Sequence, residues 1–139
     1  MRALKLLITI FLCAAAVTAA AVLPAKLCFK NAEKYTFFCG TSSADCTEVS
    51  AETNAQGARL LLSEVCGEAA EFSDFNLKSF LKSVNGKIIF TEKLSDSVNY
   101  YCTADLPYSV NLNGTEINLH ICVRGTSAKA ASPIIFGGY

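Results

Sequence analysis

The chain has 139 residues, and its twelve basic side chains equal its twelve acidic ones in number. This length suits a single domain. Nucleic-acid binding needs a concentrated basic field, which a neutral chain without a run of Lys and Arg does not supply, so we set that class of partner aside.

Residues 1–21 have the layout of a secretory signal peptide. Arg2 and Lys5 precede an apolar run, and small residues at positions 18–21 are typical of a cleavage site. A transmembrane anchor is the alternative, but the run lacks a basic stop-transfer flank. Cleavage near residues 19–21 would leave ten basic and twelve acidic residues, a net charge of about −2, and no transmembrane span in the mature chain. We expect a secreted protein or one on the extracellular surface.

Seven cysteines are present, and one of them, Cys13, lies in the predicted signal. An even number in an oxidising compartment predicts three disulfides. Zinc is the competing explanation, but no C-x-x-C or H-x-x-x-H pair occurs. The six remaining cysteines are Cys28, Cys39, Cys46, Cys66, Cys102 and Cys122.

The first half of the expected six-cysteine domain, residues 22–124, mixes strands with ambiguous segments. Residues 26–30 and 34–40 are predicted strands, and the second has apolar side chains on both faces. Residues 41–57 are predicted to be mostly loop, anchored by Cys46. Residues 58–67 fit either a short helix or a buried strand.

One helix is expected near residues 74–84. Ser73 can cap it, apolar residues recur at helical spacing, and Asn85-Gly86 ends it. Lys78 and Lys82 then lie on its polar face.

From residue 87 the pattern becomes β. Asn113-Gly114 between two alternating runs predicts a hairpin that pairs residues 108–112 with 115–123. Residues 125–139 have no periodicity, so we expect a flexible C-terminal tail. The predicted core draws on both halves of the chain: Phe37, Leu61, Phe80, Ile89, Tyr100, Leu119 and Ile121.

No pattern in the sequence specifies a reaction. His120 is the only histidine, and no G-x-S-x-G motif accompanies it. Carboxylates are scattered, and no calcium-loop pattern occurs. We therefore expect no enzyme, cofactor or metal site, with His120 as a strand residue on the polar row.

Two surface features are candidates for function. Asn113-Gly114-Thr115 is an N-x-[ST] acceptor at the predicted hairpin tip, so Asn113 is a candidate for glycosylation. The alternative, that Asn113 and Gly114 serve only the backbone geometry of the turn, explains the motif equally well. Lysines that converge in space would form a patch for anionic glycans. The candidates are Lys26, Lys30, Lys34, Lys78 and Lys82.

The cysteine spacing and several short motifs are similar to the SAG-related surface-antigen domain of coccidian apicomplexan parasites. The motifs are YTFFCG, CTEV, GKIIFTEKLSDSVNYYCTA and a last CV strand, between Cys28 and Val123. The resemblance implies a β-sandwich with nested bridges, Cys28 to Cys122, Cys39 to Cys102 and Cys46 to Cys66. It also implies attachment to host-cell surfaces and display to host immunity.

We thus expect a mainly β, disulfide-stapled two-layer β-sandwich with one short helix. Its predicted function is that of a non-enzymatic binding or antigenic protein whose partner is a host-cell surface glycan or protein. A GPI signal needs a longer apolar tail than residues 134–136 provide. The alternatives are a cysteine-rich effector or protease inhibitor that acts through the loop at residues 41–56, and a small hydrolase that uses scattered acids.

Overall fold

The structure is a computed structural model that describes residues 1–22, 26–41, 45–137 and 139, with the backbone alone for residues 2 and 19–22. Helix α1 spans Arg2–Val22 and carries the predicted signal, whose expected cleavage region falls where no side chain is described. In the described part of the chain, no helix combines the length and the apolar character needed to cross a membrane.

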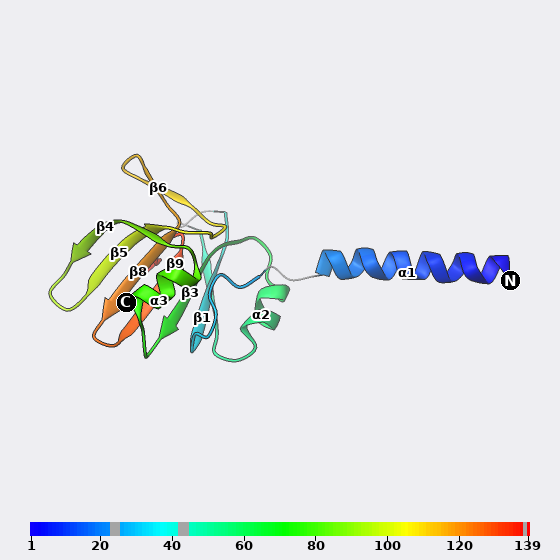
Figure 1. Cartoon of the computed structure of the whole chain (residues 1–139), viewed down its shortest axis with the longest axis horizontal. Coiled ribbons are helices and arrows are strands. Elements are labelled where there is room, and N and C mark those ends of the chain that lie inside the picture. The colour runs from blue at the N-terminus through cyan, green and yellow to red at the C-terminus, as the bar shows by residue number, and fades with distance from the viewer. Residues whose placement is uncertain (23–25, 42–44, 138) are drawn as a thin grey trace.

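The rest of the chain is mainly β, as predicted (Figure 1). Seven antiparallel strands form one sheet in the order β2-β1-β3-β9-β8-β5-β4, and β6 pairs with β7 in a separate ribbon. The predicted sandwich of two facing sheets is therefore not what the strands form. The strands are β1 Lys34–Cys39, β2 Thr47–Ala51, β3 Val65–Phe72, β4 Lys87–Lys93, β5 Val98–Thr103, β6 Val110–Leu112, β7 Thr115–Ile117, β8 Leu119–Arg124 and β9 Ser127–Ser132.

Strand β1 is buried on both faces, which confirms the prediction for this segment. Phe37 contacts the main core on one face, whereas Phe38 contacts a second cluster on the other. The ring of Phe136 packs edge-on against Phe38 at 4.7 Å between centroids. The C-terminal segment thus covers part of the second face of the sheet.

The prediction of a flexible tail at residues 125–139 is wrong. Strand β9 occupies the middle of the sheet, where it pairs with β3 and β8. Ala128, Ala130 and Ala131 are fully buried there. Small side chains allow close packing but carry little of the β-branched or aromatic signal by which strands are recognised in sequence.

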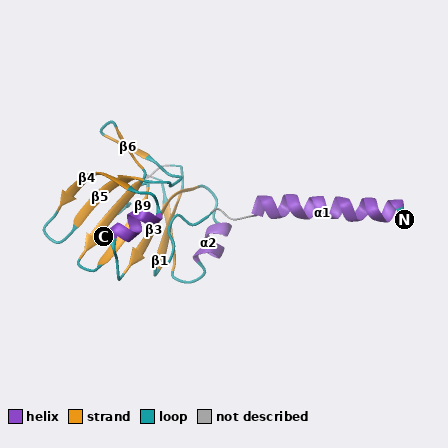
Figure 2. Cartoon of the chain, viewed as in Figure 1, coloured by secondary structure: helices purple, strands orange, loops and turns teal. Residues whose placement is uncertain are grey.

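Two helices accompany the sheet, α2 Ala55–Leu61 and α3 Leu77–Ser83 (Figure 2). Helix α3 confirms the predicted helix, but its N-cap is Asn76, whose Oδ1 accepts from Ser79 N at 2.9 Å, and not Ser73. Its C-terminal end confirms the expected turn, since Asn85 has φ 52°. The ambiguous segment at residues 58–67 contains both alternatives, the end of α2 and the start of β3.

Residues 26–30 do not form the predicted strand. The backbone N–H groups of Cys28 and Phe29 donate to Glu68 Oε1, at 3.0 and 3.4 Å, and not to a neighbouring strand. Phe29 is buried and stacks on Phe80 of α3, with 5.8 Å between ring centroids. A side-chain carboxylate thereby holds this segment against the sheet.

The predicted hairpin turn forms at Asn113 and Gly114, both with positive φ, but it pairs only residues 110–112 with 115–117. Strand β8, which was expected to continue the hairpin, pairs instead with β5 and β9. The second strand is interrupted at Asn118, whose side chain bonds both Ala104 N and Ala104 O at 2.6 Å. Asn118 thereby holds the segment that leads from β5 into the hairpin.

The predicted core is correct in part. Phe37, Leu119 and Ile121 are fully buried, and Phe80 and Tyr100 pack against them. Leu61 is 88% exposed at the end of α2, and Ile89 is 42% exposed on the edge strand β4. Their positions at the margin of the fold explain both errors.

Candidate functional site

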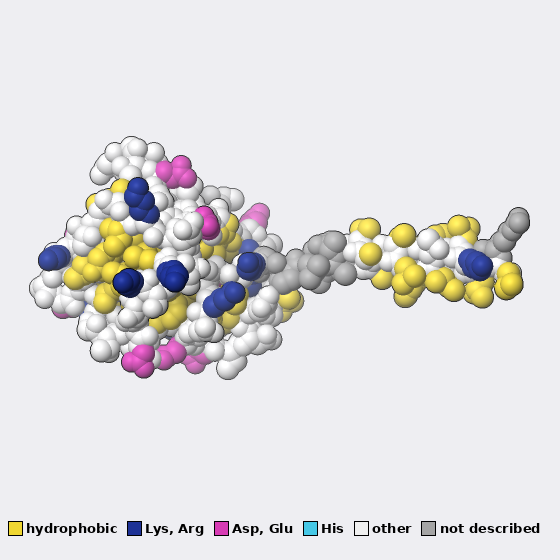
Figure 3. Space-filling view, in the orientation of Figure 1, with side chains coloured by type: hydrophobic (Ala, Val, Ile, Leu, Met, Phe, Trp, Pro, Cys, Tyr) yellow, Lys and Arg dark blue, Asp and Glu magenta, His cyan; other side chains and the backbone are white. Residues whose placement is uncertain are grey.

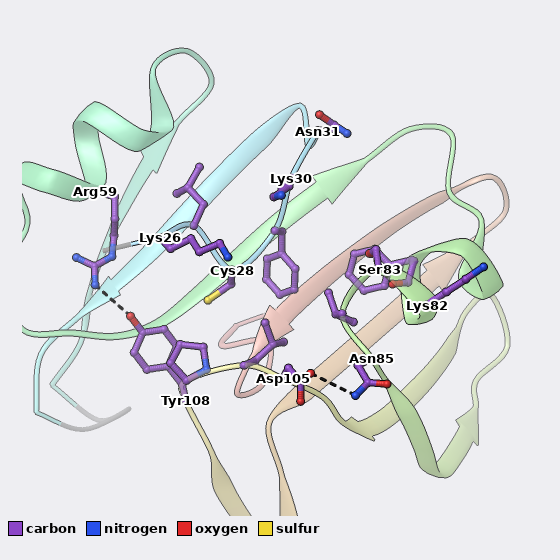
Figure 4. A pocket seen from close by; sticks show the side chains of 16 residues that line it. Lys26, Cys28, Lys30, Asn31, Arg59, Lys82, Ser83, Asn85, Asp105 and Tyr108 are labelled. Carbon is purple, nitrogen blue, oxygen red and sulfur yellow. Dashed lines mark hydrogen bonds between the residues drawn. The ribbon is translucent and has the colours of Figure 1, made fainter. Parts of the chain in front are cut away.

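The candidate site is a pocket of about 830 Å³ beside α3 (Figure 4). Four segments form its walls: residues 26–31, Arg59 of α2, residues 82–85 at the C-terminal end of α3, and residues 105–108. Glu68 holds the first wall in place, and Asn118 holds the start of the last one. The pocket is therefore built on segments tied to the sheet by side-chain hydrogen bonds.

Four basic side chains line this pocket, and Asp105 is the one acidic residue among its described lining residues. Three of them, Lys26, Lys30 and Lys82, belong to the predicted lysine set. Lys34 and Lys78 do not line it: Lys34 begins β1, and Lys78 is exposed on α3. In the space-filling view, Lys and Arg side chains are spread over the face that carries α3, between apolar side chains (Figure 3).

Arg59 completes the basic set, and sequence reasoning missed it. Its Nη2 donates to the hydroxyl of Tyr108 at 3.2 Å. Arg59 lies in the last turn of a short helix that the sequence left ambiguous, and Tyr108 is 49 residues away. No local signal in the sequence could have brought these two residues together.

A buried carboxyl group lies behind the wall formed by Cys28 and Phe29. Glu68 is 0% exposed, and Oε2 makes no hydrogen bond with the described protein atoms. Burial raises the pKa of Glu68, although the N–H groups of Cys28 and Phe29 and the charge of Arg59 oppose the shift. Burial also raises the pKa of the Cys28 thiol, reinforced by the charge of Glu68, so Cys28 is a neutral thiol and a poor nucleophile.

His120 lies on the opposite face of the sheet, away from the pocket. Its Nδ1 accepts from Ile135 N at 3.2 Å, so Nε2 carries the proton and donates to Asn99 Oδ1 at 3.1 Å. The ring stacks on Tyr101 at 4.5 Å between centroids. Burial lowers the pKa of His120 to about 4, against the opposing charge of Glu92. These contacts give a neutral imidazole in a structural role.

This arrangement predicts that acid destabilises the fold through His120. The folded pKa of about 4 lies below the ordinary value of 6.5, so this contribution is fully present above pH 6.5 and is lost as the pH falls towards 4. The loss is up to about 3 kcal/mol at pH 4. Denaturant unfolding at pH 7 and pH 4 should show a smaller acid loss in His120→Gln than in the unmodified protein. Equal losses would contradict the assignment.

The structure contains no disulfide bond between described cysteines, so the predicted bridges are not observed. Cys46 and Cys66 both pack against the second cluster, whereas Cys28, Cys39 and Cys102 contact the main core. Cys122 follows the core residue Ile121 in β8 and therefore points to the opposite face. The implied pairing of Cys28 with Cys122 does not fit this arrangement, because the sheet separates the two thiols.

The remaining predicted positions are placed as follows. Asn113 is exposed in the turn between β6 and β7. The ribbon that contains this turn projects from the rest of the domain (Figure 1). The proposed inhibitor loop at residues 41–56 contains strand β2 and the start of α2, and its residues 42–44 lie outside the described part of the chain. Among described residues, no group of three or more His, Cys, Asp or Glu side chains is placed to hold a metal ion.

Comparison of the chain with protein families, with curated proteins and with solved structures finds no match. The resemblance to the SAG-related surface-antigen domain therefore stays a prediction from the cysteine spacing and the short motifs.

Proposed function

We propose that this chain is an exported, non-enzymatic binding protein that uses the basic pocket to hold an anionic ligand on a cell surface. One observation carries the proposal: four cations from three separate segments, Lys26, Lys30, Arg59 and Lys82, line a single pocket in which Asp105 is the one acid among the described lining residues. A concave site with several cations concentrates anions even when the whole chain is nearly neutral.

Sulfated surface glycans are the ligand class that motivates the first test. Attachment to a host cell and display to immunity, which the family resemblance implies, are consistent with such a ligand. Export would place the six cysteines in an oxidising compartment, where we expect disulfides between cysteines that lie on the same side of the sheet. An exposed glycan on Asn113 would leave the pocket clear, since residues 113–115 do not line it.

The test compares two double variants that change the net charge equally. Lys26→Glu/Lys30→Glu reverses two cations in the pocket, whereas Lys34→Glu/Lys78→Glu reverses two outside it. We expect the first variant to lose most of its binding to intact cells and to immobilised heparin, and the second to keep it. Cell binding is measured by flow cytometry with labelled protein.

Salt supplies the second readout of the same test. Raising the ionic strength from about 0.1 M to 1 M shortens the screening length from about 10 Å to 3 Å, so contacts with exposed lysines should weaken steeply. Equal binding by the two double variants, or binding that is unchanged at 1 M salt, would overturn the proposal.

A further inference from the structure

The basic pocket combines one charged end with an apolar wall. Arg59 is half-buried, whereas Lys26, Lys30 and Lys82 are exposed at the rim. The ring of Phe80 is partly exposed on the wall and stacks on the buried ring of Phe29 behind it, with 5.8 Å between centroids. Val84 and Leu106 extend this wall. The positive charges of the pocket therefore lie at Arg59 and at the rim, whereas the wall between them is apolar.

The charged end is at Arg59. Within the described part of the chain, no carboxylate lies at ion-pair distance from its guanidinium, and Tyr108 is its hydrogen-bond partner. The nearby carboxyl group of Glu68 interacts with Arg59 through its charge, but its Oε1 accepts hydrogen bonds from the backbone N–H groups of Cys28 and Phe29. A half-buried guanidinium without an ionic partner is suited to bind an anion through two parallel hydrogen bonds.

The opposite end is less suited to an anion. Asp105 lies there and accepts from Asn85 Nδ2 at 3.2 Å. Figure 4 shows the Lys82 side chain pointing away from the Arg59–Tyr108 end, whereas Lys26 lies on the side of the pocket near Arg59. Arg59 is thus the cation placed to bind an anionic group at this end, with Lys26 on the same side of the pocket.

The apolar wall limits what else the ligand can be. A sulfated glycan would keep its sulfate and hydroxyl groups at the exposed lysines of the rim, because in contact with Phe80 and Leu106 these groups would lose water without gaining a hydrogen bond. A hydrocarbon or aromatic body gains free energy from the same contact.

We infer that the pocket binds an amphipathic anion, whose single carboxylate, sulfate or sulfonate lies at Arg59, on the side of the pocket that Lys26 also lines, and whose apolar body packs on Phe80, Val84 and Leu106. This inference rests on the proposed function, because it names the class of anionic ligand that the same pocket takes.

The probe is 8-anilino-1-naphthalenesulfonate, one sulfonate joined to an aromatic body, whose fluorescence rises in apolar surroundings. It is titrated into the folded protein, the full chain, at pH 7. We expect saturable binding that Arg59→Gln weakens about tenfold or more, because a hydrogen-bonded charge is lost. Lys34→Gln, outside the pocket, should leave the affinity unchanged. Probe bound to exposed apolar residues of α1 would not respond to Arg59→Gln.

Two further arms make the outcome decisive. Arg59→Lys keeps the charge but loses the planar guanidinium, so we expect an affinity between those of the unmodified protein and Arg59→Gln if the guanidinium donates two hydrogen bonds to the anion. Circular dichroism checks that each variant is folded. A heparin-derived disaccharide is added as competitor. If the disaccharide binds in a lysine-dependent way but the probe does not respond to Arg59→Gln, this inference is overturned and the proposed function stands. If neither ligand binds in the pocket, both fail.

Discussion

Ala130→Asp is expected to unfold the β domain. Ala130 is fully buried at the centre of the sheet, where it pairs with Ala70 of β3 and Ile121 of β8 and contacts the main core. An aspartate there would bury a charge without a partner and would be larger than the space available. We expect a loss of about 4 kcal/mol or more in the free energy of unfolding, a large part of the stability of a domain of this size.

Thr126→Asp provides the matched control, because Thr126 lies in the exposed turn before the same strand. Its expected change is within about 0.5 kcal/mol. Thermal unfolding by circular dichroism compares the two variants. If residues 125–139 were a flexible tail, both substitutions would leave the melting temperature nearly unchanged, and the position of β9 would be wrong.

The second large effect is expected at Phe37. This side chain is fully buried in the main core, next to residues from both halves of the chain. Phe37→Ala removes buried apolar surface and leaves a cavity, at a cost of about 3–5 kcal/mol. Leu61 carries a side chain of the same class but is 88% exposed, so Leu61→Ala should cost less than about 0.5 kcal/mol.

Urea unfolding of both variants gives the comparison. The sequence alone placed both residues in the core, so it predicts large losses for both. A loss at Leu61 comparable to that at Phe37 would mean that α2 packs against the domain more closely than the structure shows.

Much of the fold was predictable because local signals agreed with the final structure. Strands β1, β4 and β5 are rich in aromatic and β-branched residues, α3 has apolar residues at helical spacing, and the Asn113-Gly114 turn has residues that tolerate positive φ. Strand β9 was missed because its buried alanines pack closely between β3 and β8 but have a weak preference for strands. The sequence of residues 127–132 alone does not indicate that this segment pairs with other strands.

The site was predictable only in part, for a similar reason. Five lysines were singled out as candidate cations, and the fold brings three of them to one pocket and leaves Lys34 and Lys78 outside it. Arg59 and Tyr108 meet only because β3 and β8 are in the same sheet and Asn118 holds the segment before Tyr108. The apolar wall depends on the stack of Phe29 on Phe80, which the expected strand at residues 26–30 would not have produced.

The claim that the basic pocket is the binding surface is tested most directly by nuclear magnetic resonance. Backbone amide signals of the folded protein are followed while the naphthalenesulfonate probe and, separately, the heparin disaccharide are added. The account predicts saturable shifts concentrated at residues 26–31, at Arg59, at residues 82–85 and at residues 105–106. Shifts confined to strand β4, to the C-terminal segment or to the hairpin tip, or no shift at saturating ligand, would contradict it.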